Sequence, residues 1–302
     1  MAHHLRPHAT KNGNREMDMS TKSAMVLMAA VTIARSTSFI FSKTLLHSME
    51  PLNILAVRFL VAFLVLAVMF NKKLREMDRG TFLGGVLLGL VYTSVLGFEM
   101  LGLRQVDTGV SSFIENAAVV IVPIYQAILF RALPKKNTFF CAIIAFVGVG
   151  FLSLSSGIGE LNMGIVYTII AALSYAAAIM VTASLSAKYD PITIGVMQIG
   201  TLGVVTLILS LILETPRIPT EPANWVMILI LALVCTCFGF TLQPLAQKYI
   251  STDTAAIFSA LNPLSACIIG ILFAGEPYGL YKLIGAVLIM TGVMMSILKK
   301  AD

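Results

Sequence analysis

Ten apolar stretches occupy the chain from about residue 22 to residue 298. A helix needs about 20 apolar residues to cross a bilayer, and each stretch comes close to that length. The connections between them are short, so no water-soluble domain has room to form. The sequence therefore predicts an all-α, polytopic membrane protein with ten transmembrane helices. The predicted spans are 22–47, 51–70, 80–103, 108–131, 137–155, 162–187, 191–213, 224–248, 253–274 and 279–298.

The last five stretches repeat the first five at an offset of 140 to 144 residues. Pro51 opens the second stretch as Pro191 opens the seventh, each at a first helical turn where proline is tolerated. Further along, Thr108 corresponds to Thr252. Because five is an odd number of crossings, the second copy is expected to run upside down relative to the first.

Two inverted five-helix repeats are thus expected, covering 22–155 and 162–298, after a disordered N-terminal tail at 1–21. Inverted repeats around a site near the bilayer midplane are typical of secondary transporters. The pattern therefore favours a transporter with a small-molecule substrate and a lipid-embedded body.

The basic residues indicate orientation rather than a polyanionic partner. The chain carries a formal net charge of +6, yet only 12% of its residues are charged, against roughly 25% in soluble proteins. With the N-terminus inside, most lysines and arginines fall in inner loops and tails, while the outer loops hold Arg104 and Arg217. The positive-inside rule then predicts a protein of the plasma or inner membrane with both termini in the cytoplasm. Because the basic residues are explained by this orientation, we expect no nucleic acid as a partner.

The sequence contains no pattern typical of an enzyme or a metal site. All four cysteines fall inside apolar stretches, without the polar partners that a zinc site needs. There is no His-Glu-x-x-His run and no glycine-rich phosphate loop. We therefore expect neither catalysis nor a cofactor or metal. A channel-like or structural membrane role is the remaining non-enzymatic alternative.

Two sequence runs resemble the EamA branch of the drug/metabolite transporter superfamily. The first extends from Gly102 through Asp107-Thr108-Gly109 to Val122-Pro123, and the second from Ala246 to Asn262-Pro263. The resemblance covers all ten stretches. It implies a ten-helix carrier that exports small metabolites, with a central cavity and both ends in the cytoplasm.

Five charged residues lie within the first-half spans: Arg35, Lys43, Arg58, Glu99 and Glu115. An ionised group in hydrocarbon costs about 2.5 to 3.5 kcal/mol on insertion scales, so such residues need partners or a wet cavity. Counting along each helix places Lys43 level with Glu99 and Arg58 level with Glu115. We therefore expect these two ion pairs, unless the long stems carry the cations to the interface. Arg35, near the midplane, is left to hold an anionic substrate group.

The predicted substrate site combines these charges with nearby polar and aromatic side chains, and its second-half wall is polar but neutral. Two further prolines, Pro123 and Pro263, lie inside the fourth and ninth spans, where they serve either gating or mere packing. The candidate binding residues are Arg35, Arg58, Tyr92, Glu99, Phe113, Glu115, Asn116, Tyr175, Gln198, Gln243 and Asn262.

These residues favour a secondary exporter of amino acids or similar small metabolites that works by alternating access. Glu115 suggests the proton as coupling ion, because burial raises a carboxyl pKa, although an Arg58 partner would lower it. The alternative is a proton-coupled exporter of lipophilic cations or drugs, with Glu115 as the counter-charge. An unpaired Arg35 counts against that alternative.

Overall fold

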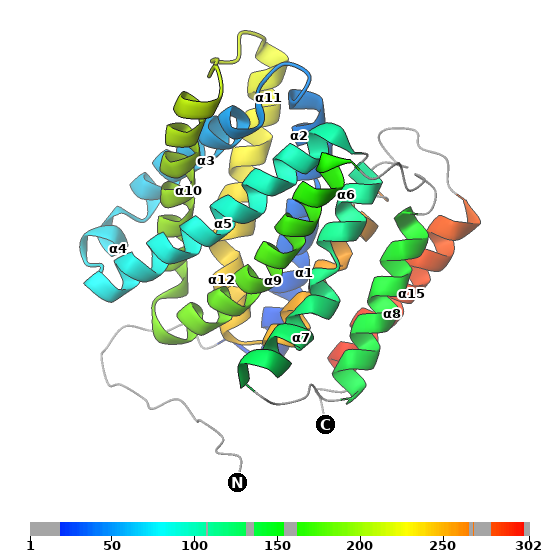
Figure 1. The fold of residues 1–302 in the computed structure, drawn as a ribbon. Helices are drawn as coiled ribbons and strands as arrows, with labels where there is room; N and C mark the ends of the chain where they lie inside the picture. The colour runs from blue at the N-terminus through cyan, green and yellow to red at the C-terminus, as the bar shows by residue number, and fades with distance from the viewer. Residues whose placement is uncertain are drawn as a thin grey trace.

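The computed structural model describes residues 19–106, 108–130, 136–153, 162–265, 268 and 279–298. Regular secondary structure in these residues is helical throughout, in agreement with the predicted all-α class. Figure 1 shows the helices as one bundle, with α8 and α15 side by side at one edge. In chain order the helices are α1 (Thr21–Ser36), α2 (Ser38–Leu45), α3 (Pro51–Met69), α4 (Asn71–Arg75), α5 (Arg79–Gln105), α6 (Thr108–Glu115), α7 (Ala118–Phe130), α8 (Lys136–Ser153), α9 (Met163–Lys188), α10 (Pro191–Leu213), α11 (Pro222–Ile230), the π-helical segment η2 (Leu231–Phe240), α12 (Thr241–Lys248), α13 (Thr252–Ser259) and α15 (Leu280–Leu298).

Seven helical stretches of the described chain are long and apolar enough to cross a membrane. They correspond to the predicted spans one to four and six to eight. The fifth and tenth predicted spans are present as the shorter apolar helices Lys136–Phe151 and Leu283–Met295. Most of the ninth span beyond Ser265 lies outside the described residues, as do the predicted tail up to residue 18 and residues 154–161. The structure therefore supports a multi-pass helical protein without establishing the number ten.

Helix starts follow the local sequence signals. Pro51 and Pro191 occupy the first turns of α3 and α10, as their places in the repeat predict. Asp190 caps α10 by accepting the N–H of Thr193 at 2.9 Å. Partial burial raises the pKa of Asp190, but hydrogen bonds from Thr193 and the charge of Lys73 outweigh it and hold that pKa below its usual value.

Three of the spans are interrupted near their middle. The first breaks at Thr37, between α1 and α2, and the fourth breaks at Asn116 and Ala117, between α6 and α7. The ninth breaks at Ala260, directly after α13. With the repeat offset of 144 residues, Ala260 corresponds to Asn116, so the two repeats interrupt the same helix at the same place.

The eighth span contains a different irregularity. It passes from α11 into ten residues of π-helix, η2, before returning to α-helix in α12. π-helical turns are rare, and they occur often at functional sites. The apolar sequence of this span gives no sign of the change in winding.

The two ends of the bundle are held together in different ways. We call them the Glu50 end and the Asp190 end, after the residues that precede α3 and α10. At the Glu50 end, Glu50 pairs with Arg104 at 2.6 Å. At the Asp190 end, Lys73 pairs with Asp190 at 3.1 Å, and both side chains are more than two-fifths exposed. Exposed pairs of this kind contribute little to stability.

Glu214 caps the start of α3 from the other repeat. Its two carboxylate oxygens accept the N–H groups of Leu52 and Asn53, each at 2.9 Å, and Ser210 donates to one of them at 3.0 Å. Glu50 occupies the capping position of α3 itself but makes no side-chain capping bond. Glu214 therefore satisfies the helix donors that would otherwise lack a partner.

Replacing Glu214 with Ala should lower the free energy of unfolding by roughly 0.5–2 kcal/mol, the usual cost of losing an N-cap. Thermal unfolding of the purified protein in detergent measures the change. Glu221→Ala is the matched control, because Glu221 is exposed and precedes α11 without capping it. Equal melting temperatures for the two variants would contradict the assigned role of Glu214.

Candidate functional site

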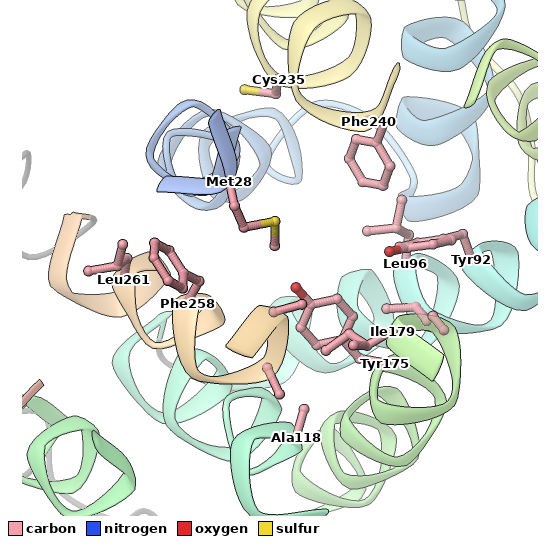
Figure 2. Close-up of a cluster of buried hydrophobic side chains, with 14 of the residues drawn as sticks. Met28, Tyr92, Leu96, Ala118, Tyr175, Ile179, Cys235, Phe240, Phe258 and Leu261 are labelled. Carbon is pink, nitrogen blue, oxygen red and sulfur yellow. The ribbon is translucent and has the colours of Figure 1, made fainter. Parts of the chain in front are cut away.

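Side chains from six spans converge on the centre of the bundle. Figure 2 shows Met28 from α1, Tyr92 from α5, Tyr175 from α9 and Phe240 from η2 around a common space, with both tyrosine hydroxyl groups directed toward it. These four residues are almost wholly buried. The remaining sides of the ring come from α7 and α13.

Arg35 lies in a cage of aromatic rings at the end of α1. Its guanidinium carbon is 4.1 Å from the ring centre of Phe240, 5.7 Å from that of Tyr175 and 5.9 Å from that of Tyr92. Ring faces attract a cation most strongly where water is excluded, and Arg35 is only 9% exposed. The three rings thus compensate part of the cost of removing this charge from water.

A hydrogen-bonded chain fixes the same guanidinium. Arg35 Nη1 donates to Gln243 Oε1 at 2.5 Å, and Gln243 Nε2 donates to the hydroxyl of Tyr92 at 2.8 Å. We call Arg35, Tyr92, Tyr175, Phe240 and Gln243 the Arg35 cage. Residues of both repeats build it, because Arg35 and Tyr92 belong to the first and the other three to the second.

The π-helical segment supports both buried arginines. Arg58 Nε donates to the Thr236 hydroxyl at 2.8 Å, and the Arg58 guanidinium lies 5.0 Å from the ring centre of Phe59. Gly239 allows Arg35 to approach, because a Cβ built there would lie 2.6 Å from Arg35 Cγ. Any larger residue at position 239 would therefore displace the Arg35 side chain.

Two carboxylates face this pair of arginines. Glu99 on α5 interacts electrostatically with both Arg35 and Arg58, and Glu115 at the end of α6 interacts with Arg35 and Glu99. All four charged side chains are buried. They form one coupled cluster whose formal charges sum to zero when both glutamates are ionised.

The predicted pairing of Lys43 with Glu99 is wrong. Lys43 Nζ donates instead to the backbone carbonyl groups of Leu103 and Val106, at 2.6 and 3.0 Å. These carbonyls lie at the end of α5, where the helix itself offers no partner. The flexible lysine stem reaches this end rather than the carboxylate one turn deeper.

The predicted ion pair of Arg58 with Glu115 is also wrong. Arg58 donates to Thr236, and its charged neighbours are Glu99 and Arg35. Depth along the helices predicted Glu115 as the partner of Arg58. The Arg58 side chain instead leaves α3 in the direction of η2. The sequence predicted one surplus positive charge on Arg35, because Lys43 and Arg58 were each assigned a glutamate. Since Lys43 pairs with neither glutamate, Glu99 and Glu115 together balance Arg35 and Arg58, and no surplus charge remains.

Several predicted site residues have a buried polar atom that lacks a hydrogen-bond partner among the described residues. The unpaired atoms include Glu115 Oε2, Asn116 Oδ1, Gln198 Oε1 and Asn262 Oδ1. Asn116 sits at the break between α6 and α7, and its amide nitrogen donates to the Ser112 carbonyl at 2.7 Å. Unpaired buried polar groups are uncommon in native proteins, and a bound solute or ion is one explanation for them.

The structure brings most, but not all, of the predicted site together. Arg35, Arg58, Tyr92, Glu99, Glu115, Tyr175 and Gln243 share the central cluster. Phe113 stacks on Phe146 of α8 with ring centres 5.1 Å apart and does not line the cage. Pro123 lies within α7, and Pro263 lies in the short helical stretch after Ala260.

Sequence reasoning missed Thr236 and Gly239. No charge or repeat correspondence marks either residue. The local signal is a hydroxyl and a glycine three residues apart within the otherwise apolar segment 231–240.

Replacing Tyr92 with Phe should lower the free energy of unfolding by about 1–3 kcal/mol, because Gln243 Nε2 loses its acceptor in a buried position. Melting temperature in detergent measures the loss. Tyr167→Phe is the control, since Tyr167 is partly exposed and its ring packs against Phe98. If the two variants melt together, the Gln243–Tyr92 bond does not contribute as described.

Comparison with known proteins finds several transporters among the relatives of this chain. An uncharacterized transporter of Archaeoglobus fulgidus is 23% identical over 291 residues, covering 93% of this chain and 99% of the relative. A second transporter of that organism is 28% identical over 180 residues, and the match covers 63% of its length. Uncharacterized transporter YxxF of Bacillus subtilis is 25% identical over 70% of this chain and 68% of its own.

Among solved structures, one titled only as the crystal structure of a protein has a TM-score of 0.76 at 12% identity, covering 92% of this chain and 97% of the other. At that identity the likeness concerns the fold alone. The sequence profile of the EamA-like transporter family matches residues 22–154 and again residues 162–298, so the family pattern occurs twice in the chain. The chain therefore belongs to the EamA-like transporter family and is a multi-pass membrane transporter.

Proposed function

We propose that this transporter is a secondary active exporter of amino acids or similar small metabolites, with the Arg35 cage as its substrate site. The two repeats would lie inverted in the cell membrane, with both termini in the cytoplasm, and would expose the cage to either side in turn. The observation that carries the proposal is a preoriented, buried guanidinium at the meeting point of the two repeats.

Arg35 is suited to bind a carboxylate. A guanidinium has five N–H donors in a rigid fork, and those of Arg35 interact with Gln243 through Nη1 and with the hydroxyl groups of Tyr92 and Tyr175. The aromatic cage holds the fork in place, so a substrate carboxylate meets donors that are already oriented. Charge-assisted bonds of this kind are roughly twice as strong as neutral ones.

Glu115 supplies an acceptor for the other end of an amino acid. Its Oε2 atom is buried and has no hydrogen-bond partner in the part of the chain that the structure describes, and the side chain interacts electrostatically with Arg35. An ammonium group that donates to Glu115 while the carboxylate accepts from Arg35 adds no net charge to the cluster. A zwitterion thus fits the balance of two arginines and two glutamates.

The export of lipophilic cations is the second candidate, and two observations favour it. The unpaired Glu115 oxygen and the aromatic faces around Arg35 would both attract a cation. Such a substrate would compete with Arg35 for the rings and would not use the guanidinium. Anion recognition by Arg35 therefore separates the two candidates.

In proteoliposomes, Arg35→Gln should reduce the counterflow of labelled amino acids by about 10- to 100-fold, the loss expected for a charged hydrogen bond of about 1.5–3 kcal/mol. Arg104→Gln is the control, since Arg104 forms a half-exposed pair with Glu50 away from the cage. Melting temperatures would confirm that both variants fold. Undiminished amino acid counterflow in Arg35→Gln would favour the cation exporter. The same conclusion would follow if the wild-type protein transported a quaternary ammonium compound but no amino acid.

Proton coupling through Glu115 is tested separately. Glu115→Gln keeps the shape of the side chain but cannot exchange a proton, so a pH gradient should no longer drive uptake. Substrate counterflow without a gradient should persist at a reduced rate. Gradient-driven uptake at the wild-type rate in this variant would exclude Glu115 as the coupling residue.

A further inference from the structure

Two buried polar side chains lie beyond the Arg35 cage, toward the Asp190 end, and have no role in the cage itself. Ser186 on α9 and Gln247 on α12 are at most 2% exposed. The Ser186 hydroxyl and both amide atoms of Gln247 have no hydrogen-bond partner among the described residues. Each such group costs free energy unless water or a solute satisfies it.

The helical repeat places both residues on the faces that form the cage. On α9, Tyr175, Ile179, Thr182 and Ser186 follow at intervals of three and four residues and therefore share one face. On α12, Gln247 is four residues from the cage residue Gln243. α9 and α12 pack against each other. The face of α9 that carries Ser186 and the face of α12 that carries Gln247 therefore form one surface that continues from the cage.

This surface runs toward the Asp190 end. α9 ends at Lys188, two residues before Asp190. The eighth span starts at the Glu50 end, where Asn224 donates to the Ser48 hydroxyl, so α12 must end at the opposite side. Ser186 lies about 16 Å beyond Tyr175 along the helix.

An apolar layer separates the cage from the Asp190 end. Met28 precedes Arg35 by two turns on the same face of α1, and Ile179 lies one turn beyond Tyr175. Phe258 belongs to α13, which starts at the Asp190 end. All three are buried members of one hydrophobic core, and Figure 2 shows Met28 pointing into the space between Phe258 and Tyr175.

We propose that Ser186 and Gln247 line a hydrated route between the Arg35 cage and the Asp190 end, and that Met28, Ile179 and Phe258 close this route in the present structure. The proposal rests on the proposed transport function, because it names the path that the substrate takes on one side of its site. The unbranched Met28 side chain can move aside more readily than a branched one. Ser186 and Gln247 lie on the Asp190 side of this layer, near the ends of α9 and α12, so opening the layer joins the stretch that they line to the cage.

Thiol accessibility tests the route without any substrate. The four native cysteines are replaced by Ala, and Ser186→Cys or Gln247→Cys is introduced singly. Purified protein in detergent is then treated with a small charged methanethiosulfonate, and modification is followed by mass. The control thiol is Ala176→Cys, which is buried on α9 but about 100° away from the lined face.

We expect the thiols at positions 186 and 247 to be modified about tenfold faster or more than the Ala176→Cys thiol, because they line the hydrated stretch on the Asp190 side of the layer. A Gln243→Cys thiol, on the cage side, should react slowly until Met28→Ala or Phe258→Ala weakens the layer. Rates at positions 186 and 247 that match the control, or a Gln243→Cys rate that neither truncation changes, would overturn the proposal. Ser186→Cys is nearly isosteric and carries the test if the Gln247 variant does not fold.

The outcome separates this proposal from the proposed function. Fast labelling together with absent amino acid flux leaves the route intact and removes the substrate assignment. Robust flux that depends on Arg35, with no labelling at positions 186 and 247, leaves the substrate assignment intact and removes the route.

Discussion

The burial of the Arg35 guanidinium in the membrane-spanning bundle is the constraint on which the site depends. A charge at this depth is costly, and the protein compensates by three ring faces, one amide oxygen and two neighbouring carboxylates. Both repeats must contribute, because neither alone supplies the cage. The interaction therefore joins the two halves of the chain at the proposed substrate site, and it makes the position of Arg35 sensitive to any movement of one half against the other.

Irregular backbone surrounds this charge. α1 breaks at Thr37, two residues after Arg35, and η2 winds as a π-helix beside it so that Thr236 reaches Arg58 and Gly239 admits Arg35. Non-helical and π-helical backbone within a membrane is tolerated where protein or a wet cavity satisfies its polar groups. The matching breaks at Asn116 and Ala260 fit the same rule. The regular helices form the bundle, and their interruptions lie near the buried charged residues.

Hydropathy and the internal repeat were sufficient to predict the helical class and the starts of α3 and α10, because both depend on one-dimensional patterns, while the resemblance of two sequence runs pointed to the family. The same patterns identified Arg35, Tyr175 and Gln243 as site residues. The two predicted ion pairs are wrong because counting residues gives the depth of a side chain along its helix but not the direction in which it points around the helix. The side chains of Lys43 and Arg58 point instead to the end of α5 and to η2. The π-helix lay beyond reach, since its sequence is as apolar as that of its neighbours.

The corrected contacts change the electrostatic character of the site. With Lys43 removed from the count, two arginines face two glutamates, and the cluster is neutral rather than positive when all four are ionised. Protonating one glutamate then gives the cluster the charge that attracts an anion, while ionising it restores the balance that suits a zwitterion. In the proposed exporter, the occupancy of a proton on Glu115 and the charge of the preferred substrate would consequently be linked through one buried cluster. A carrier built on this cluster can couple the two without a separate proton site, because each ligand alters the field that the other meets.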